Sequence, residues 1–414
     1  MSGAVSLFAE PTRMTMQEAI DLTVQSLRAY GEQHQHWGIA YSGGKDSSAT
    51  LTLVLHLIET GQVPQPESLT VYYADTRQEL PPLALAAQAM LSRLTEHSNW
   101  VRSAVVTAPL DKRFLVYILG RGVPPPNNNT LRWCTRQIKV DPMTAAIAEH
   151  LKGLPGNLLM ITGVRQGESA VRDRRIEMSC GKDGAECGQG WYQQVLPESP
   201  GIRGRIATLA PLLHWRVCHV WDWLRFHAPA GEYGGWPTAL VADAYGGEEA
   251  EEINARTGCT GCPLASRDTA LDNILRRPEW TYLAPLKGLK PLYQELRLPQ
   301  NRLKKTGLDG DGNIARGKNK QRMGPLTFEA RLMALDRVLA IQAEINKAAK
   351  TLGRPEVDLV SAEEEARIRD LITLGTWPNG WEGDEPRADK LMDHILPDGT
   401  VMPNLLAEMD IQDA

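Results

Sequence analysis

The chain has 414 residues, of which 42% are hydrophobic and 23% are charged, and its formal net charge is −5. This length exceeds what one ordinary core needs, so we expect one large domain with further segments. The acidic balance excludes a general polyanion binder, and any contact with nucleic acid must come from a local basic patch. No apolar run approaches the roughly 18 residues of a membrane span, and residues 1–13 lack the pattern of a signal peptide. We therefore expect a cytoplasmic protein with no membrane partner.

The first half of the chain alternates between predicted helices and strands. Helices are predicted over 14–33, 47–59 and about 80–97, and strands over 37–41, 68–73, 101–107 and 158–162. This alternation predicts an α/β fold, in which helices cover both faces of a parallel sheet. Polar clusters follow three of the strands, at the carboxyl ends where such sheets bind their ligands.

The pattern changes beyond residue 176. Residues from about 180 to 270 are rich in Gly, Cys and Trp, with one helix predicted near 217–227, and residues 302–322 carry seven basic residues against two acids. Helices are predicted from about 325 to 350 and from Ser361, which forms a capping-box pattern with Glu364. We predict a nucleotide-binding α/β domain over 1–175 and a Cys-containing insertion over 176–300 that completes the active site. A basic linker with a mostly helical C-terminal region follows over 301–414.

A Gly-rich segment, Ser42-Gly43-Gly44-Lys45-Asp46-Ser47, lies between a predicted strand and a predicted helix. Paired glycines let the backbone approach a phosphate closely, and the helix start offers free N–H groups and the positive end of a dipole. Lys45 adds a positive charge. The spacing differs from that of a Walker A loop. We therefore predict a phosphate-binding loop of another type, with a tight turn that binds no ligand as the alternative.

These six residues match letter for letter the SGGKDS signature of the PP-loop ATP pyrophosphatases, and the chain resembles that family. The resemblance implies an adenine nucleotide alpha hydrolase-like fold and cleavage of ATP between its α- and β-phosphates. It implies that ATP is bound by Ser42, Gly43, Gly44, Lys45, Asp46 and Ser47. Mg²⁺ is implied as well, because it offsets the developing phosphate charge.

Three further segments recur in the same order in the phosphoadenylyl-sulfate (PAPS) reductase-like proteins. They are ADTRQELPP from Ala74, RWCTRQIKVDP from Arg132 and GVRQGESAVR from Gly163. Over roughly residues 35–265 the chain is most similar to the DndC-type proteins of DNA phosphorothioation systems. This resemblance implies that Lys45, Asp46, Asp75 and Arg165 act in catalysis and that Arg132 and Arg172 help to bind the nucleotide. Lys139 could converge on phosphates together with Arg132, Arg165 and Arg172, and for each arginine a surface salt bridge is the alternative.

Six cysteines stand at positions 134, 180, 187, 218, 259 and 262. In a cytoplasmic chain they favour metal ligands, reactive thiols or buried side chains over disulfides. Cys259 and Cys262 have the spacing of ligands for zinc or an iron–sulfur cluster. The resemblance to DndC-type proteins implies a 4Fe–4S cluster on Cys134, Cys259, Cys262 and a fourth cysteine, for which Cys187 is preferred to Cys180. Cys218 is predicted to be a core residue, and the alternatives to the cluster are zinc bound with His214 or His219 and a purely structural cysteine pair.

The resemblance thus implies an enzyme that spends ATP to adenylate a phosphate oxygen of DNA, which sulfur then replaces. Its partners would be a cysteine desulfurase and other subunits of the modification system, with residues 302–322 contacting DNA or, alternatively, forming a solvated loop. A sulfonucleotide reductase is less well supported, because its Glu-Cys-Gly motif is C-terminal, whereas Glu186-Cys187-Gly188 lies mid-chain. A tRNA thiolation enzyme and a nucleotide-gated assembly subunit without turnover are the other hypotheses.

Overall fold

The computed structural model describes residues 14–128, 132–167, 173–174, 176, 191–195, 204–245 and 258–406. Their contacts divide the chain into two compact units. Unit 1 draws on residues 1–74, 80–106 and 143–257, and unit 2 draws on residues 75–79, 107–142 and 258–414. The chain therefore crosses between the units five times, and neither unit is a continuous stretch of sequence. The three-part division along the chain stays a prediction.

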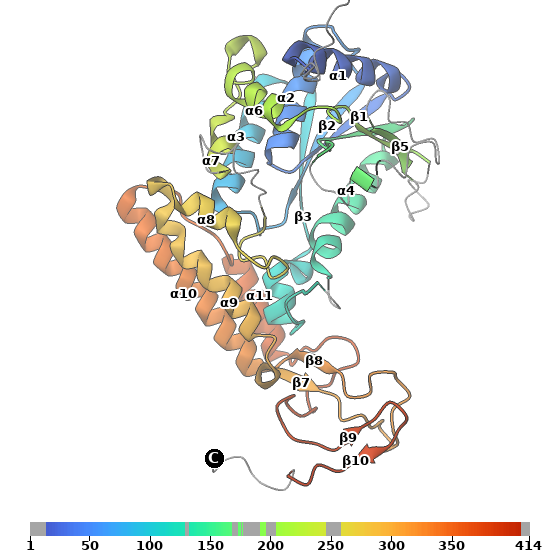
Figure 1. Ribbon diagram of the computed structural model, residues 1–414, viewed down its shortest axis with the longest axis vertical. Coiled ribbons are helices and arrows are strands. Elements are labelled where there is room, and N and C mark those ends of the chain that lie inside the picture. The colour runs from blue at the N-terminus through green and yellow to red at the C-terminus, as the bar shows by residue number, and fades with distance from the viewer. Residues whose placement is uncertain are drawn as a thin grey trace, which may run out of the picture. The chain divides into compact units, whose positions relative to one another are not determined.

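Unit 1 is built on a six-stranded sheet with the order β3-β2-β1-β4-β6-β5 (Figure 1). Its main elements, in chain order, are α1 (Met16–Gly31), β1 (His36–Tyr41), α2 (Lys45–Glu59), β2 (Ser68–Asp75), α3 (Pro81–His97), β3 (Val101–Thr107), α4 (Asp141–Lys152), β4 (Leu158–Thr162), β5 (Trp191–Val195), β6 (Ile206–Ala210), α6 (Val217–Asp222) and α7 (Ala239–Ala244). β1 pairs in parallel with β2 and β4, and β4 with β6, so the predicted parallel sheet is confirmed. The edge strand β5 runs antiparallel to β6, which the sequence did not predict.

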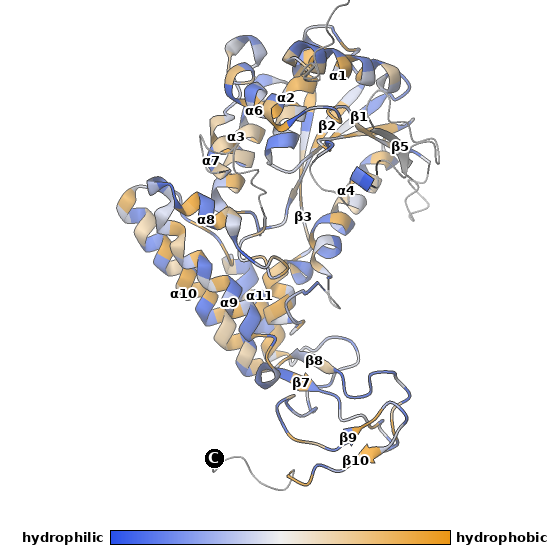
Figure 2. Cartoon of the chain, viewed as in Figure 1, coloured by the Kyte–Doolittle hydropathy of each residue, from blue (hydrophilic) through white to orange (hydrophobic). Residues whose placement is uncertain are grey.

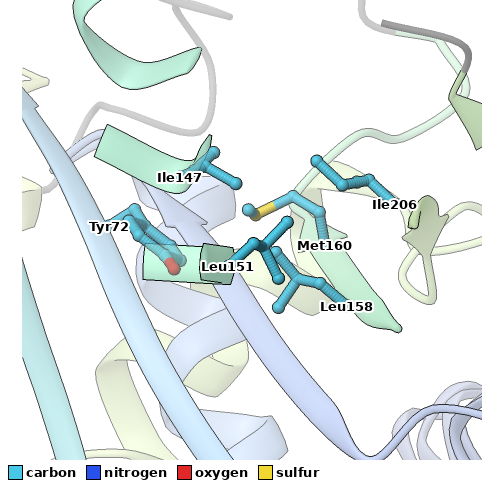
Figure 3. Close-up of a cluster of buried hydrophobic side chains, with 6 residues drawn as sticks. All are labelled: Tyr72, Ile147, Leu151, Leu158, Met160 and Ile206. Atoms are coloured by element: carbon cyan, nitrogen blue, oxygen red, sulfur yellow. The ribbon is translucent and has the colours of Figure 1, made fainter. Parts of the chain in front are cut away.

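Helices pack on both faces of this sheet, as predicted. On one face Ile147 and Leu151 of α4 meet strand residues, and Figure 3 shows this buried cluster of Tyr72, Ile147, Leu151, Leu158, Met160 and Ile206. Gly38 of β1 leaves room for it, because a Cβ there would lie 3.0 Å from side-chain atoms of both Tyr72 and Met160. On the other face the Trp37 indole donates to the Gly31 carbonyl oxygen at the end of α1 (3.3 Å).

Unit 2 has a helical part and a part with short strands. Its main elements are η1 (Leu110–Lys112), η2 (Val116–Gly120), η3 (Arg136–Val140), α8 (Thr269–Leu275), η7 (Pro278–Gly288), α9 (Leu289–Glu295), β7 (Arg302–Lys304), β8 (Met323–Leu326), α10 (Phe328–Leu352), α11 (Ala362–Thr373), β9 (His394–Ile395) and β10 (Val401–Met402). Hydrophobic and hydrophilic residues alternate along α10 (Figure 2), as expected of a helix with one buried side. Ser361 and Glu364 form the predicted capping box of α11. Of the helices described here, none has the length and apolar character needed to cross a membrane.

A fully buried arginine joins three segments of unit 2. The Arg331 guanidinium donates to the carbonyl oxygens of Leu326 (3.1 Å), Gly120 (3.2 Å) and Thr376 (2.8 Å), and lies 4.2 Å from the centre of the Trp377 ring. Burial lowers the pKa of Arg331 to about 9, so the group stays charged at neutral pH. The side chain therefore supplies hydrogen-bond donors to carbonyl groups from three separate segments.

Truncating this side chain should destabilise the protein strongly. Arg331→Ala opens a cavity and leaves three carbonyl groups without their donor, so we expect a loss of about 3–5 kcal/mol in the free energy of unfolding. Urea denaturation followed by circular dichroism measures it. Arg369→Ala is the matched control, since Arg369 is 46% exposed and forms an i,i+4 pair with Glu365 (2.8 Å), and we expect it to cost less than about 0.5 kcal/mol. Equal losses in the two variants would contradict the structural role of Arg331.

Candidate active site

The predicted phosphate loop joins the end of β1 to the start of α2. Gly43 has a φ of 74°, a left-handed conformation that favours glycine. Gly44 is the N-cap of α2 and has no side chain with which to cap it. The Ser47 hydroxyl donates to the Gly44 carbonyl oxygen (2.9 Å) and accepts from the Ser42 N–H (3.2 Å). The loop is thus held in shape by one of its own serines.

Two cations meet one carboxylate at the start of α2. Lys45 Nζ lies 3.1 Å from Asp46 Oδ2, and Arg165 Nε donates to Asp46 Oδ1. Another Arg165 nitrogen donates to the Trp215 carbonyl oxygen (3.2 Å). The side chains of Lys45, Asp46 and Arg165 are only 10%, 13% and 6% exposed. Three of the four predicted catalytic residues therefore lie together, and their two positive charges exceed the one negative charge.

Gly163, immediately after β4, allows this meeting. A Cβ at Gly163 would lie 2.8 Å from the Asp46 carbonyl carbon and 2.9 Å from the Ser47 backbone nitrogen. Atoms this close must move, and backbone at the start of a buried helix moves less easily than the end of a flexible side chain. The close approach of the two segments is therefore possible only with glycine at this position.

Gly163→Ala should accordingly displace the loop. Overpacking of this kind costs roughly 1–3 kcal/mol, so we expect the affinity for ATP to fall about 10-fold or more. Isothermal titration calorimetry with Mg·ATP measures the affinity. Gly231→Ala is the control, because a Cβ there meets nothing within 4 Å. A Gly163→Ala protein that binds ATP as tightly as the Gly231→Ala protein would show that the contact does not shape the loop.

Tyr245 is a site residue that the sequence did not predict. It directly follows α7, and its hydroxyl oxygen accepts a hydrogen bond from the Lys45 N–H (3.2 Å). The Lys45 ammonium lies 5.0 Å from the centre of the Tyr245 ring. A Cβ at Gly44 would meet the same hydroxyl at 2.9 Å. The second loop glycine is therefore needed for Tyr245 as well, but 200 residues separate the partners, and no local pattern reveals such a pair.

The fourth predicted catalytic residue, Asp75, ends β2 and begins a turn. Its Oδ1 accepts a hydrogen bond from the Arg77 N–H (2.9 Å). Arg77 has a φ of 57°, which is uncommon for a residue with a side chain. Its guanidinium forms ion pairs with Asp358 (2.8 Å) and with Glu364 in the first turn of α11 (3.0 Å). The C-terminal helical region thus fixes the turn that carries Asp75.

The Cys-x-x-Cys segment pairs with the same turn. Glu79 and Cys259 form an isolated antiparallel β-bridge, and the Thr260 N–H donates to the Gln78 carbonyl oxygen (2.7 Å). Gly261 has a φ of 61°, and a Cβ there would lie 2.7 Å from Leu289 Cβ. Two motifs that lie about 180 residues apart are therefore neighbours in unit 2.

Cys134, Cys259 and Cys262 influence one another electrostatically. Burial is the main reason why the pKa of Cys134 is raised, and Cys262 adds to the shift. Although Cys259 is exposed as a residue, burial of its thiol raises its pKa to about 12, and Cys262, Glu79 and Cys134 add to this while Lys139 opposes it. Three of the four predicted metal ligands are therefore neighbours in unit 2. Cys187, like Cys180, lies outside the described residues.

Thiols are ligands for a soft metal or an iron–sulfur cluster, so the chemical type of this donor set suits either. Within the described part of the chain, however, no three His, Cys, Asp or Glu side chains are grouped closely enough to hold a metal ion. His219 is used within the protein: Nδ1 accepts from the Arg216 N–H (3.2 Å) and Nε2 bonds the Met14 carbonyl oxygen (2.9 Å). A zinc site that includes His219 would break both bonds.

The prediction that Cys218 is a core residue is wrong. Cys218 is exposed, because α6 buries its neighbours His219, Val220 and Trp221 instead. Of the remaining predicted nucleotide-binding residues, Arg132 is exposed in unit 2 and Arg172 lies outside the described residues.

The raised pKa of Cys259 predicts slow alkylation. In metal-free protein at pH 8 we expect iodoacetamide to modify Cys259 roughly 50-fold more slowly than a thiol of ordinary pKa, because little thiolate is present. Below a pKa of about 12, each unit of added pH should raise the rate about tenfold. Peptide mass spectrometry measures the rate at each cysteine, with the exposed Cys218 as internal reference. A rate at Cys259 that is flat between pH 7 and pH 10 would contradict the shift.

The first half of the chain resembles a known protein family. Residues 36–229 match the family model of the phosphoadenosine phosphosulfate reductase domain. Over these residues, just under half of the chain, the sequence is similar to that domain. The matched segment contains the phosphate loop, Asp75, Cys134 and Arg165, whereas Cys259, Cys262 and the C-terminal helices lie beyond it.

No curated protein matches the chain significantly. Among solved structures, FMN adenylyltransferase from Candida glabrata, in complex with FMN and an ATP analogue, is similar with 15% identity and a TM-score of 0.30, over 53% of this chain. The chain spans 60% of the length of that enzyme. The U34-tRNA thiolase NcsA from Methanococcus maripaludis, with its 4Fe–4S cluster, is similar with 15% identity and a TM-score of 0.34, over 68% of this chain and 82% of the thiolase. These similarities are too weak to carry an argument about this chain's function.

Proposed function

We propose that the chain is an ATP pyrophosphatase that adenylates a backbone phosphate of DNA for sulfur transfer, as a DndC-like component of DNA phosphorothioation. One observation carries the proposal: buried Lys45 and Arg165 meet on Asp46 at the uncapped start of α2, within the segment that is similar to a PAPS reductase domain. Two cations against one carboxylate leave a net positive charge at a helix N-terminus, which is the environment that a pyrophosphate group requires.

Different residues would have different roles in the cleavage of ATP. Lys45, Arg165 and the backbone N–H groups of the loop stabilise charge that builds up on the departing pyrophosphate. Asp75, a carboxylate at the end of β2, would bind Mg²⁺, since Mg²⁺ prefers oxygen ligands. Arg132 and Arg172 would add contacts to the nucleotide.

Sulfur would enter through the cysteines of unit 2. Cys134, Cys259 and Cys262, with Cys187 as the fourth ligand, would hold a 4Fe–4S cluster, with zinc as the less favoured metal. When bound, the cluster would supply sulfur-transfer chemistry, with sulfur delivered by a cysteine desulfurase. The support is the proximity of three thiols to one another and to the turn that carries Asp75.

DNA would bind at residues 302–322. Part of this segment is occupied: Lys305 pairs with Glu385, and Lys320 donates to the carbonyl oxygens of Leu396 (3.5 Å) and Pro397 (3.0 Å). Arg316, Lys318 and Arg322 are exposed. Arg322 also lies over the Trp381 ring (5.7 Å), so Arg316 and Lys318 are the exposed cations best placed for a phosphate backbone.

Mass spectrometry of DNA from cells with and without the gene tests the acceptor. We expect phosphorothioate dinucleotides only in cells with the gene, and their loss in a Lys45→Met strain. Equal amounts of phosphorothioate dinucleotides in all three strains would contradict the proposal. Thiolated tRNA that disappears with the gene would instead support tRNA thiolation. Sulfite released by the purified protein from an adenylylated sulfate without ATP cleavage would support a sulfonucleotide reductase.

A further inference from the structure

Unit 1 contains a cavity of about 580 Å³ beside the phosphate loop, which we call the β4–β6 cavity. It is lined by residues 165–167, which follow β4, by residues 213–217, which follow β6, and by Met14 and Lys45. The two segments are joined by a hydrogen bond from the Gln166 N–H to the Leu213 carbonyl oxygen (3.0 Å). The cavity thus lies at the carboxyl ends of two parallel strands, where sheets of this kind bind ligands.

The lining of the β4–β6 cavity is strongly positive. Lys45, Arg165 and Arg216 contribute three cations, and no acidic residue is among the described residues that line it. Asp46 offsets one of these charges through its contacts with Lys45 and Arg165. Arg216 is exposed and has no ion pair within the described part of the chain. The two buried cations share one carboxylate and Arg216 adds a further positive charge, so the lining has a positive excess that favours an anionic occupant.

The remaining polar lining suits an oxyanion as well. Burial lowers the pKa of His214, so its imidazole is neutral at neutral pH and offers one N–H donor without adding charge. A volume of about 580 Å³ lies within the usual range of small-ligand sites, roughly 300–1,000 Å³. A single phosphate with its neighbouring sugars therefore enters such a cavity, but a whole duplex does not.

Lys45 belongs to the phosphate loop and lines this cavity, and Arg165, which also lines the cavity, pairs with Asp46 of the loop, so an occupant adjoins a nucleotide held on the loop. We infer that the β4–β6 cavity binds the reacting oxyanion of the second substrate, with Arg216 and His214 as its specific contacts. The inference rests on the proposed function and deepens it, because it assigns a place to the acceptor. In the reaction an oxygen of a DNA phosphodiester attacks the α-phosphorus of ATP. A new P–O bond forms, the bond to the β-phosphate oxygen breaks, and its electron pair leaves with pyrophosphate.

Equilibrium binding tests the inference. The full-length protein, saturated with Mg²⁺ and a non-hydrolysable ATP analogue, is titrated against a fluorescent 12-nucleotide single strand of DNA and, separately, adenosine 5′-phosphosulfate. We expect Arg216→Ala to weaken the binding of both the DNA probe and adenosine 5′-phosphosulfate by about 10-fold or more, because a charge-assisted hydrogen bond is lost. The affinity of the Arg216→Lys protein for each probe should lie between the affinities of the Arg216→Ala protein and the native protein. The affinity for the ATP analogue should change less than about twofold, because Arg216 is outside the loop.

Arg102→Ala is the matched control, since it removes one exposed positive charge from β3, away from the cavity lining. An equal loss of DNA affinity in the Arg102→Ala and Arg216→Ala proteins would overturn the inference, and so would a loss of ATP-analogue affinity alone. Native protein that binds neither probe would overturn it too. Binding of adenosine 5′-phosphosulfate but not of DNA, with the same dependence on Arg216, would support the cavity as an oxyanion site while the proposed function fails.

Discussion

Replacing Lys45 by methionine should lower the rate of pyrophosphate release from ATP by about 100-fold or more. The ammonium is the loop's own charge and lies 3.1 Å from the carboxylate of Asp46. A preorganised charge in a buried site contributes far more to a transition state than the same charge in water, and removing one such group costs roughly 10²–10³ in rate. A coupled assay for pyrophosphate measures this effect.

Two variants sharpen the test of Lys45. Lys152→Met removes a lysine that is 71% exposed and pairs with the exposed Glu149, so its rate should equal that of the native protein. Lys45→Arg keeps the charge but changes its shape, and we expect partial activity. If Lys45→Met folds normally and releases pyrophosphate at the native rate, the loop does not bind the reacting phosphates.

Replacing Asp46 by alanine should destabilise the ligand-free protein by about 3–5 kcal/mol. The change leaves the buried cations Lys45 and Arg165 without their shared carboxylate, and breaking a buried ion pair on one side costs this much. Added pyrophosphate supplies the missing negative charge. It should therefore raise the melting temperature of Asp46→Ala by more than it raises that of the native protein.

Differential scanning fluorimetry with and without pyrophosphate measures both effects of Asp46→Ala. Asp358→Ala is the control, because Asp358 is 56% exposed and its pair with Arg77 should contribute less than about 1 kcal/mol. If the Asp46 variant melts like the native protein and pyrophosphate stabilises both equally, the carboxylate does not compensate the two cations.

The sequence predicted those parts of the site that depend on local signals. The loop, the helix that follows it and the capping box at Ser361 each depend on neighbouring residues, and all are present. The carboxyl ends of parallel strands share one edge of the sheet, so the sequence could predict that Arg165 and Asp46 lie in the same region. It could not predict that they form an ion pair. The distance between them depends on Gly163, whose role becomes visible only once the backbone of α2 is placed against it.

Contacts between distant segments could not be predicted. The hydrogen bond between Lys45 and Tyr245 joins segments far apart in the sequence, and so does the β-bridge between Glu79 and Cys259. Neither contact follows from a repeating sequence pattern. The edge strand β5 is only five residues long, too short for a clear alternation. Cys218 was misassigned because a helix of six residues gives too little periodicity to decide which side is buried.

The repeated crossing of the chain between the two units has a consequence for synthesis on the ribosome. Residues 107–142 leave the exit tunnel early, yet their unit is completed only by residues 258–414. At roughly 5–20 residues per second, the apolar side chains of Val116, Ile118 and Leu119 wait on the order of 10–40 seconds for α10. During that interval the nascent chain exposes apolar side chains that can aggregate or bind chaperones. We therefore expect residues 107–142 to be a main cause of chaperone dependence and of low soluble yield during synthesis.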